Sequence, residues 1–321
     1  MNKIKTFILV LIILLLTGCG KKELKEYTKE FNYFNSDISI KLYTTSSDKA
    51  KAAFEYIEDI YKDYENIINR DNESSEIFYI YNNNSKDKKI KISNNMYNLI
   101  EYGLKLYKDS NGYLSINTGY LVDIWNEYYQ KNTIPSNIEL KNINTNINKI
   151  NIKNNVMDNN HVNLYFNQFI KGYINKLIKE YLMSINIDYY FINTGNEVLT
   201  GKNINDEDYI VAISSPFKKD VLKVFNVQNK YIVTKSIYYN SYEYDNEIYS
   251  SIVDAKEKTM ANNMISVTVM GDDIYNTELA ANLLFINDYY DGKELAKKYD
   301  VDVIWCYKDN KGHEVIKSNI E

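Results

Sequence analysis

Glycine is scarce in this chain, and the positions of the few glycines constrain the fold more than the rest of the composition does. The 321 residues include 11 glycines, whereas glycine usually makes up ~7% of a protein. Glycine permits left-handed turns and close backbone approaches. A glycine inside structured-looking sequence therefore indicates special backbone geometry. The clearest case is Gly172 in the segment 169–173 (FIKGY), where a helical pattern begins.

The segment around Gly172 has the pattern of a strand-to-helix turn. An apolar stretch at 162–166 predicts a strand that runs through Asn167 and Gln168 into the helix. The first N–H groups of a helix lack partners, and the helix dipole favours negative charge there. Lys171 and Gly172 at such a turn fit a backbone that approaches an anion such as phosphate. Taken alone, the pair is a weak motif, and a helix that merely begins near a glycine explains it better.

The first twenty residues read as an export signal. A lysine-containing start precedes an apolar core at 7–16, which is too short to span a membrane, and Cys19 follows Leu-Thr-Gly. A cysteine in this setting resembles a bacterial lipobox. The sequence therefore predicts a lipoprotein signal peptide at 1–18, lipidation of Cys19, and a charged tether at 19–32. The protein would then be lipid-anchored to a membrane of the cell envelope, on its extracytoplasmic side.

Charge and histidine content exclude several classes of function. The formal net charge is -5, and the only histidines are His161 and His313. An acidic chain lacks the basic surface that nucleic-acid phosphates demand, so no nucleic-acid partner is expected. Two histidines leave little room for a zinc site or a Ser-His-Asp triad. Any metal site is therefore expected to use oxygen ligands and to hold magnesium or calcium.

The periodicity of apolar residues indicates an α+β protein. Alternation predicts strands at 38–43, 189–193, 209–214, 221–227, 231–234, 265–270 and 301–307, besides the one at 162–166. Helical spacing predicts helices at 48–68, 94–107, 277–285 and 292–298, besides the one that begins near Gly172. Runs of strands with a few helices between them favour mixed or antiparallel sheets with packed helices. We expect them to form a single large unit from 33 to 315.

Two side chains on the predicted helix at 277–285 could share a cation. Glu278 and Asn282 are four residues apart and therefore project from the same face. Two oxygen-bearing groups in that relation suit one hard cation such as Mg²⁺. The spacing also fits a solvated helix face, because the dipole favours glutamate near a helix N-terminus.

Several segments resemble, in their order and spacing, those of the ApbE family, the flavin transferases that act on exported proteins. Residues 112–125 (GYLSINTGYLVDIW) are similar to the family's Gly-Ala-Phe-Asp-Ile-Thr-Val-Gly-Pro-Leu-Val-x-Leu-Trp, and residues 165–173 (YFNQFIKGY) to its Asp-Leu-Gly-Gly-Ile-Ala-Lys-Gly-Tyr. Residues 193–197 (NTGNE) resemble Asn-Leu-Gly-Gly-Asp, and residues 278–285 resemble the family's Asp-x-x-x-Thr helix. The resemblance spans nearly all of the chain after residue 33 and implies an ApbE-like, T-fold-related architecture.

The resemblance also implies an activity. Such enzymes bind FAD, cleave its pyrophosphate with magnesium, and place FMN on a Ser or Thr hydroxyl of an exported partner protein; some hydrolyse FAD to FMN and AMP. Asp254 and Lys171 would be the catalytic residues. The magnesium ligands would be Glu278, Asn282 and the backbone carbonyl of Gln168. FAD would contact Phe34, Tyr113, Leu114, Ser115, Lys171, Gly172 and Asp254.

The chain departs from the family pattern at several of these positions. Ser115 replaces an aspartate, Asn167 and Gln168 replace a pair of glycines, and the histidines that precede Asp254 in the family are Ser250 and Ser251 here. Two functions therefore stay open. The chain is either a divergent Mg²⁺-dependent FMN transferase or FAD pyrophosphatase, or a catalytically degenerate ApbE-like lipoprotein that binds flavin or a protein partner without turnover. A third, remote option is a solute-binding or adhesive lipoprotein in which these segments are coincidental.

Overall fold

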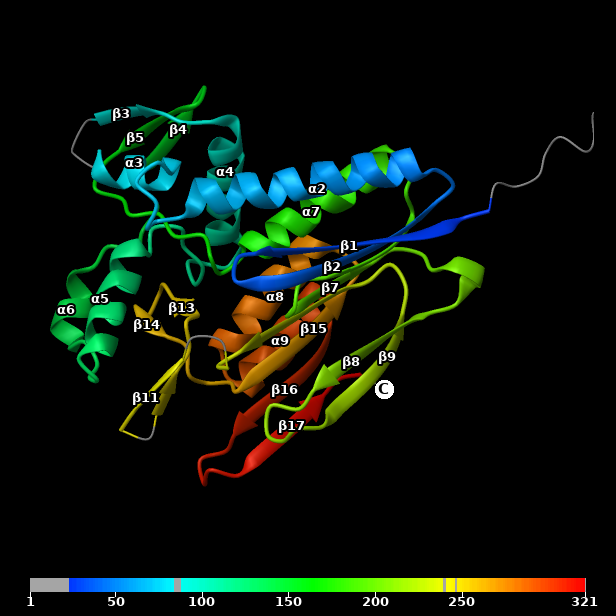
Figure 1. The fold of residues 1–321 in the computed structure, drawn as a ribbon. Coiled ribbons are helices and arrows are strands. Elements are labelled where there is room, and N and C mark those ends of the chain that lie inside the picture. Colours follow the sequence, from blue (N-terminus) through cyan, green and yellow to red (C-terminus); the bar gives the residue numbers. More distant parts are fainter. Residues whose placement is uncertain (1–22, 84–87, 239–240, 246, 321) are drawn as a thin grey trace, which may run out of the picture.

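The computed structural model describes residues 23–83, 88–238, 241–245 and 247–320 (Figure 1). The predicted signal peptide at 1–18 and the predicted lipidation site Cys19 lie outside these ranges. Within them, no helix combines the length and the apolar character needed to cross a membrane.

A large antiparallel sheet forms the centre of the fold. In the described part of the chain it has eight strands, and every neighbouring pair is antiparallel. The spatial order is β1 (Lys25–Tyr33), β2 (Ser36–Thr44), β6 (Tyr189–Asn193), β7 (Glu197–Thr200), β10 (Tyr231–Ser236), β15 (Ser266–Gly271), β16 (Asp302–Lys308) and β17 (Glu314–Ser318). Strands that are distant in the sequence, such as β2 and β6, are therefore neighbours in space.

Side chains alternate between the two faces of this sheet and make both faces apolar. On β10, Tyr231 and Val233 point to one core, whereas Ile232 points to the other. A hairpin of β8 (Tyr209–Ser214) and β9 (Val221–Val227) covers the face on which Ile232 lies, with Val211 and Phe225 turned inward. Both faces of the sheet are thus enclosed.

Helices cover the opposite face (Figure 1). They are α2 (Ser47–Ile68), α7 (Ile170–Ser184), α8 (Ile274–Ile286) and α9 (Tyr289–Tyr299). α2 contacts β1 and β2, α8 contacts β10 and β15, and α7 packs between α2 and α8. Asp273 begins α8 by accepting a hydrogen bond from a backbone N–H. Residues 277–286 are all buried, because α8 is enclosed by the sheet, α7 and α9.

A second, smaller region lies beside one end of the sheet (Figure 1). It contains the helices α3 (Glu76–Asn82), α4 (Asn94–Asp109), α5 (Gly119–Gln130) and α6 (Asn137–Asn142) and the small sheet β3 (Lys88–Lys91), β5 (Val156–Asn159) and β4 (Ile150–Lys153). The short hairpins β11 (Tyr242–Tyr244)–β12 (Glu247–Tyr249) and β13 (Val253–Asp254)–β14 (Thr259–Met260) adjoin it, and a single 3-10 turn, η1 (Ile204–Asp206), lies near β8 in the sequence. Val253 belongs to the same hydrophobic cluster as Leu121, Val122 and Trp125 of α5, so β13 packs with this region.

The α+β architecture and most of the predicted elements are confirmed. The predicted helices at 48–68 and 277–285 are α2 and α8, and the predicted strands at 209–214 and 221–227 are β8 and β9. The segments of α2, β8 and β9 carry a period of 3.6 or 2 residues, which is why the sequence revealed them. The segment of α8 has no such period, because this helix is buried on all sides.

The predicted strand at 162–166 is wrong. Its apolar side chains are buried, but its backbone lies beside residues 116–119 rather than in a sheet, since Tyr165 N–H donates to Ile116 O and Asn163 O accepts from Gly119 N–H. A short apolar run indicates that a segment is buried, but a buried segment need not be a strand.

The predicted tether at 19–32 is also wrong over most of its length. Residues 25–33 form β1, which pairs with β2 along nine residues. Phe31 is buried in the core under the helices, and Tyr27 and Tyr33 pack against that core. These three side chains share one face of β1, and exposed residues such as Glu26 and Glu30 point to the other face. The high charge of the segment concealed this period of two. At the other end, β17 continues to Ser318, so the folded unit extends past the predicted boundary at residue 315.

The central position of α8 predicts a large effect of core truncation. Leu284 is fully buried in α8. We expect Leu284→Ala to lower the free energy of unfolding by about 2–5 kcal/mol, because the removed methyl groups leave a cavity. Urea denaturation measures the change. The control Lys223→Ala, on the exposed side of β9, should change it by less than about 0.5 kcal/mol. Equal effects of both variants would contradict the central role of α8.

Candidate active site

Polar side chains gather at the one place where the sheet, α7 and α8 meet. They belong to four different elements and are nearly or fully buried. We call this group the buried polar cluster; it consists of Glu197 on β7, Tyr231 and Lys235 on β10, Asn175 on α7, and Glu278 and Asn282 on α8.

The local sequence explains how the cluster is assembled. On β10, Tyr231, Val233 and Lys235 alternate onto the helix-facing side of the sheet, so Lys235 points toward α8. Glu278 and Asn282 are one turn apart on α8 and face it. Gly172 on α7 makes the close packing possible, because a Cβ at this position would lie 2.8 Å from the Glu278 side chain. Gly172 therefore leaves room for the Glu278 side chain. Its predicted contact with FAD stays a prediction.

Lys235 joins two of the three predicted magnesium ligands. Its Nζ donates to Glu278 Oε1 at 2.6 Å and to the backbone carbonyl of Gln168 at 2.9 Å. Asn282 turns its amide nitrogen, not its oxygen, toward Glu278 Oε1, at 2.9 Å. The predicted ligands Gln168, Glu278 and Asn282 do come together, but an ammonium group lies among them.

The residues present fit this ammonium and do not fit a magnesium ion. Mg²⁺ requires oxygen ligands at about 2.0–2.1 Å in octahedral geometry, whereas the Glu278 and Gln168 oxygens already accept from Lys235. A dication about 4 Å from the ammonium would be repelled by about 8 kcal/mol at an effective dielectric constant of about 20. No group of three or more His, Cys, Asp or Glu side chains elsewhere in the described ranges could hold a metal.

Glu197 is the most strongly perturbed carboxyl group of the cluster. It accepts hydrogen bonds from Tyr231 Oη at 2.7 Å and from Asn175 Nδ2 at 2.8 Å. Burial and, second to it, the nearby Glu278 carboxylate together raise the pKa of Glu197 to about 7. Tyr231 Oη also lies 3.1 Å from Glu278 Oε2. Its single proton cannot satisfy both carboxylates at once, so it couples them.

Lys171 lies at the start of α7, next to the cluster. Its Nζ donates to Ser36 Oγ at 2.6 Å and to Asn196 Oδ1 at 3.0 Å. Burial lowers the pKa of Lys171, although Glu197 partly opposes this effect. Phe34 and Asn35 form the β1–β2 turn, where both have positive φ, and Ser36 begins β2. Ser36 links this turn to Lys171, because its hydroxyl accepts from Lys171 Nζ and lies 3.5 Å from Phe34 O.

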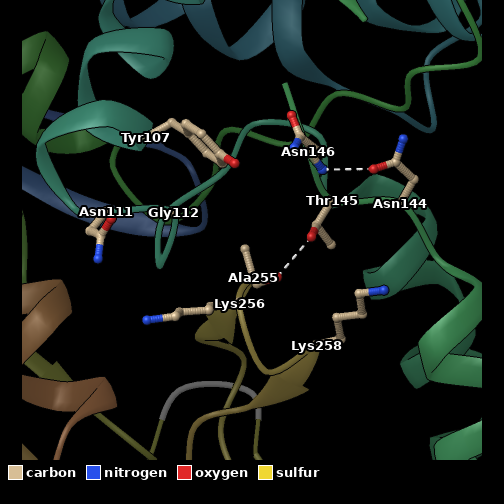
Figure 2. Close-up of a pocket in the computed structure, with 9 residues that line it drawn as sticks. All are labelled: Tyr107, Asn111, Gly112, Asn144, Thr145, Asn146, Ala255, Lys256 and Lys258. Atoms are coloured by element: carbon tan, nitrogen blue, oxygen red, sulfur yellow. Dashed lines mark hydrogen bonds between the residues drawn. The ribbon is translucent and has the colours of Figure 1, made fainter. Parts of the chain in front are cut away.

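A polar pocket of about 290 Å³ lies beside Asp254. Figure 2 shows its walls, with the lysine side chains of the 253–260 hairpin on one side and residues 144–146 on the other. Thr145 Oγ1 donates to Ala255 O at 2.8 Å and ties the two sides together. The pocket is lined by Tyr107, Asn111, Gly112, Asn144, Thr145, Asn146, Ala255, Lys256 and Lys258.

The predicted flavin contacts Tyr113, Leu114 and Ser115 adjoin this pocket. Tyr113 O accepts from Ala255 N–H at 3.0 Å, and Lys256 Nζ lies 4.5 Å from the centre of the Tyr113 ring. Leu114 is buried, and so is Ser115, whose hydroxyl donates to Thr145 O at 2.6 Å. Only Tyr113 of the three is partly exposed.

Asp254 is 6% exposed at the base of the hairpin. Its Oδ1 accepts from the backbone N–H groups of Lys256 and Glu257 at 2.9 and 3.0 Å. Burial raises the pKa of Asp254, and these two hydrogen bonds oppose the rise. Gln168 Nε2 donates to Val253 O at 3.0 Å, so the strand of Asp254 is joined directly to the segment that Lys235 holds.

Sequence reasoning missed Lys235, Glu197 and Tyr231 as site residues, and it missed the pocket lysines Lys256 and Lys258. Lys235 carried a usable signal. Lys235 follows Tyr231 and Val233 at intervals of two residues, so in a strand its side chain points to the same side as theirs, toward the core. An unpaired lysine in the core is energetically costly, which indicates a partner.

The position of Glu197 predicts a pH-dependent loss of stability. Its pKa is about 7 in the folded protein against an ordinary 4.5. A raised pKa stabilises the fold fully below the unfolded value, and this stabilisation is lost as the pH rises through the folded value. Relative to Glu197→Gln, the wild type should lose up to about 3 kcal/mol of unfolding free energy between about pH 4.5 and pH 8.

Urea denaturation of both proteins across this pH range measures the difference. The charged groups that face Glu197 are Glu278, Lys171 and Lys235, with Tyr231 as the coupling hydroxyl. Parallel stability curves for the two proteins would show that Glu197 does not titrate in this window.

The family comparison covers most of the chain. The model of the ApbE family matches residues 34–305. The FAD:protein FMN transferase of Vibrio cholerae serotype O1 is 23% identical over 249 residues, which cover 74% of this chain and 75% of that protein. The FAD:protein FMN transferase of Buchnera aphidicola subsp. Schizaphis graminum is 26% identical over 246 residues, with 72% of each chain covered.

Solved structures show the same fold. The apo form of the Pseudomonas stutzeri flavinyl transferase ApbE superposes with a TM-score of 0.78 at 17% identity, covering 94% of this chain and 96% of that one. The flavin transferase ApbE from Vibrio cholerae gives a TM-score of 0.75 at 18% identity, covering 92% and 97%. With a family match across 34–305, this chain belongs to the ApbE family.

Proposed function

We propose that this chain transfers the FMN part of FAD to a Ser or Thr hydroxyl of an exported protein. The observation that carries the proposal is that segments distant in the sequence meet at one polar site in an ApbE fold. Gln168, three residues before Lys171, donates to Val253 O and so joins the start of α7 to the strand of Asp254, and the hairpin that follows Asp254 forms one wall of a lysine-lined pocket. The names of the relatives, FAD:protein FMN transferase, support the same reaction.

The reaction is a phosphoryl-type transfer. The oxygen of the acceptor hydroxyl attacks the phosphorus on the FMN side of the FAD pyrophosphate and forms a new P–O bond. The bond from that phosphorus to the bridging oxygen breaks, and AMP leaves with the bridging oxygen. The proton of the hydroxyl passes to a base. With water in place of the hydroxyl, the same steps give free FMN and AMP.

The residues of the site suit three tasks in this reaction. Asp254 would accept the proton, because its burial makes it a stronger base than an exposed aspartate. Lys171 would offset the negative charge of the pyrophosphate. The pocket beside Asp254, with Lys256 and Lys258, would hold the AMP side. Positioning and charge stabilisation are most of what such a transfer requires of a protein.

Magnesium is left out of these steps. The resemblance implies a Mg²⁺-dependent enzyme, but the oxygens that would bind the ion accept hydrogen bonds from Lys235. The lipid anchor at Cys19 and an extracytoplasmic location at a membrane of the cell envelope complete the proposal, since an exported acceptor requires an exported enzyme.

One observation favours the alternative, a degenerate member that binds flavin without turnover. The position of the family's aspartate is Ser115 here, and the Ser115 hydroxyl is already bonded to Thr145 O. A carboxylate contact to FAD is therefore lost at this position. Flavin binding by the neighbouring Tyr113 and the pocket lysines does not depend on it.

The first functional prediction concerns Asp254. The purified full-length chain, mixed with FAD and exported proteins of the same cell, should release AMP and give flavin fluorescence on an acceptor band. Asp254→Asn should lower the rate of AMP release by about 10²–10⁴-fold, because the proton acceptor is lost. Its affinity for FAD, measured by fluorescence quenching, should stay within about tenfold of the wild type.

The outcomes separate the alternatives. AMP release with free FMN indicates an FAD pyrophosphatase, and FAD binding without AMP indicates the degenerate member. Absence of FAD binding by the wild type would contradict both. Unchanged AMP release by Asp254→Asn would remove Asp254 from the mechanism.

The second functional prediction concerns Lys171. Lys171→Met should weaken FAD binding more than about tenfold, since an ammonium near the pyrophosphate is replaced by an apolar group of similar length. The affinity of the wild type should also fall with salt more steeply than that of the variant. Lys176→Met, on the same helix and paired with Glu180, is the control and should bind FAD normally.

Thermal unfolding distinguishes binding from structure in this experiment. Lys171 also ties α7 to Ser36 and Asn196, so a purely structural role would lower the melting temperature and leave the FAD affinity of the folded protein unchanged. That result would contradict a contact between Lys171 and FAD.

A further inference from the structure

The buried polar cluster contains a cation that belongs to the protein itself. Lys235 Nζ bonds to Glu278 Oε1 at 2.6 Å and to Gln168 O at 2.9 Å, and both distances are those of charge-assisted hydrogen bonds. Lys235 is 8% exposed and Glu278 is fully buried. The pair is therefore a built part of the interior rather than a surface ion pair.

The ammonium has the two structural roles that an ion would have at this position. It neutralises the Glu278 carboxylate, which would otherwise be an uncompensated buried charge. It also holds the Gln168 carbonyl, at the entry to α7, against α8. Both oxygens are among the ligands that the family resemblance assigns to magnesium.

We propose that Lys235 takes the place of the divalent cation, so that this chain takes up no metal at Glu278 and processes FAD without one. The second half of this proposal rests on the function proposed above, whereas the first half concerns metal binding alone. The site retains one unfilled acceptor. Asn282 Oδ1 is buried and, within the described ranges, has no hydrogen-bond partner.

That arrangement predicts that a metal site can be restored by removing one side chain. Lys235→Ala would leave three oxygens facing the vacated space: Glu278 Oε1, the Gln168 carbonyl, and Asn282 Oδ1 after rotation of its amide. These are oxygen ligands of the kind that Mg²⁺ and Mn²⁺ prefer. Lys235→Met removes the charge but keeps the space filled, and so it is the matched control.

Manganese serves as the probe, because free Mn²⁺ gives an electron paramagnetic resonance signal that is lost on binding. The wild type, Lys235→Met and the surface control Lys223→Ala should leave the signal of equimolar Mn²⁺ unchanged. Lys235→Ala should remove most of it, at one ion per chain. Adding Glu278→Ala to Lys235→Ala should restore the free signal at least tenfold. Circular dichroism confirms that each variant is folded.

Activity provides the second arm and needs no variant. AMP release from FAD by the wild type should be the same, within twofold, in excess EDTA and in millimolar Mg²⁺. A protein that releases no AMP under either condition contradicts the proposed function, and the manganese experiment still decides whether Lys235 excludes a metal.

Three results would overturn the inference. The first is Mn²⁺ binding by the wild type that disappears in Glu278→Ala. The second is a folded Lys235→Ala that binds no Mn²⁺, because Lys235 would then not be what excludes the ion. The third is wild-type AMP release that falls more than tenfold in EDTA. If Lys235→Ala does not fold, the wild-type measurements alone decide the question.

Discussion

The ion pair between Lys235 and Glu278 is the interaction on which the rest of the structure depends. It joins the central strand β10 to α8, the helix enclosed on all sides, and the same ammonium reaches the start of α7. Two charges in the interior are costly unless they are paired and hydrogen-bonded. Removing either partner would leave the other charge uncompensated, so the contact ties three elements to one arrangement. Gly172 makes it possible, because any larger residue would collide with the Glu278 side chain.

The same contact positions the chemistry. Lys235 holds the carbonyl of Gln168, and the side chain of Gln168 in turn holds Val253, the neighbour of Asp254. A chain of three hydrogen-bonded residues thus runs from the middle of the sheet to the pocket edge. Groups that must act together on one substrate are kept in register by the core and not only by the loops that carry them. The core and the candidate site of this protein are therefore not separable.

Sequence patterns revealed the elements better than the contacts between them. α2, β8 and β9 were predictable because each has a period that depends only on its own residues. β1 was missed because charges lie between its inward-facing side chains, and 162–166 was taken for a strand because burial alone resembles one. Gly172 was singled out, but for a phosphate contact. Its packing against Glu278 depends on a helix about a hundred residues later, which no local pattern could reveal.

Lys235 was overlooked because a lysine in a strand pattern is normally assigned to the exposed face. Its role becomes clear only from its contacts with Glu278 and Gln168. In the buried polar cluster and beside it, the ammonium groups of Lys171 and Lys235 face the carboxyl groups of Glu197 and Glu278. Since burial raises the pKa of Glu197 to about 7, that carboxyl is largely neutral in mildly acidic solution, and a net positive charge remains. A pyrophosphate would meet an electropositive centre without an exchangeable metal. Lys235 carries one positive charge, whereas Mg²⁺ carries two. A protonated Glu197 carries no negative charge, so it leaves the positive charge of the lysines uncancelled.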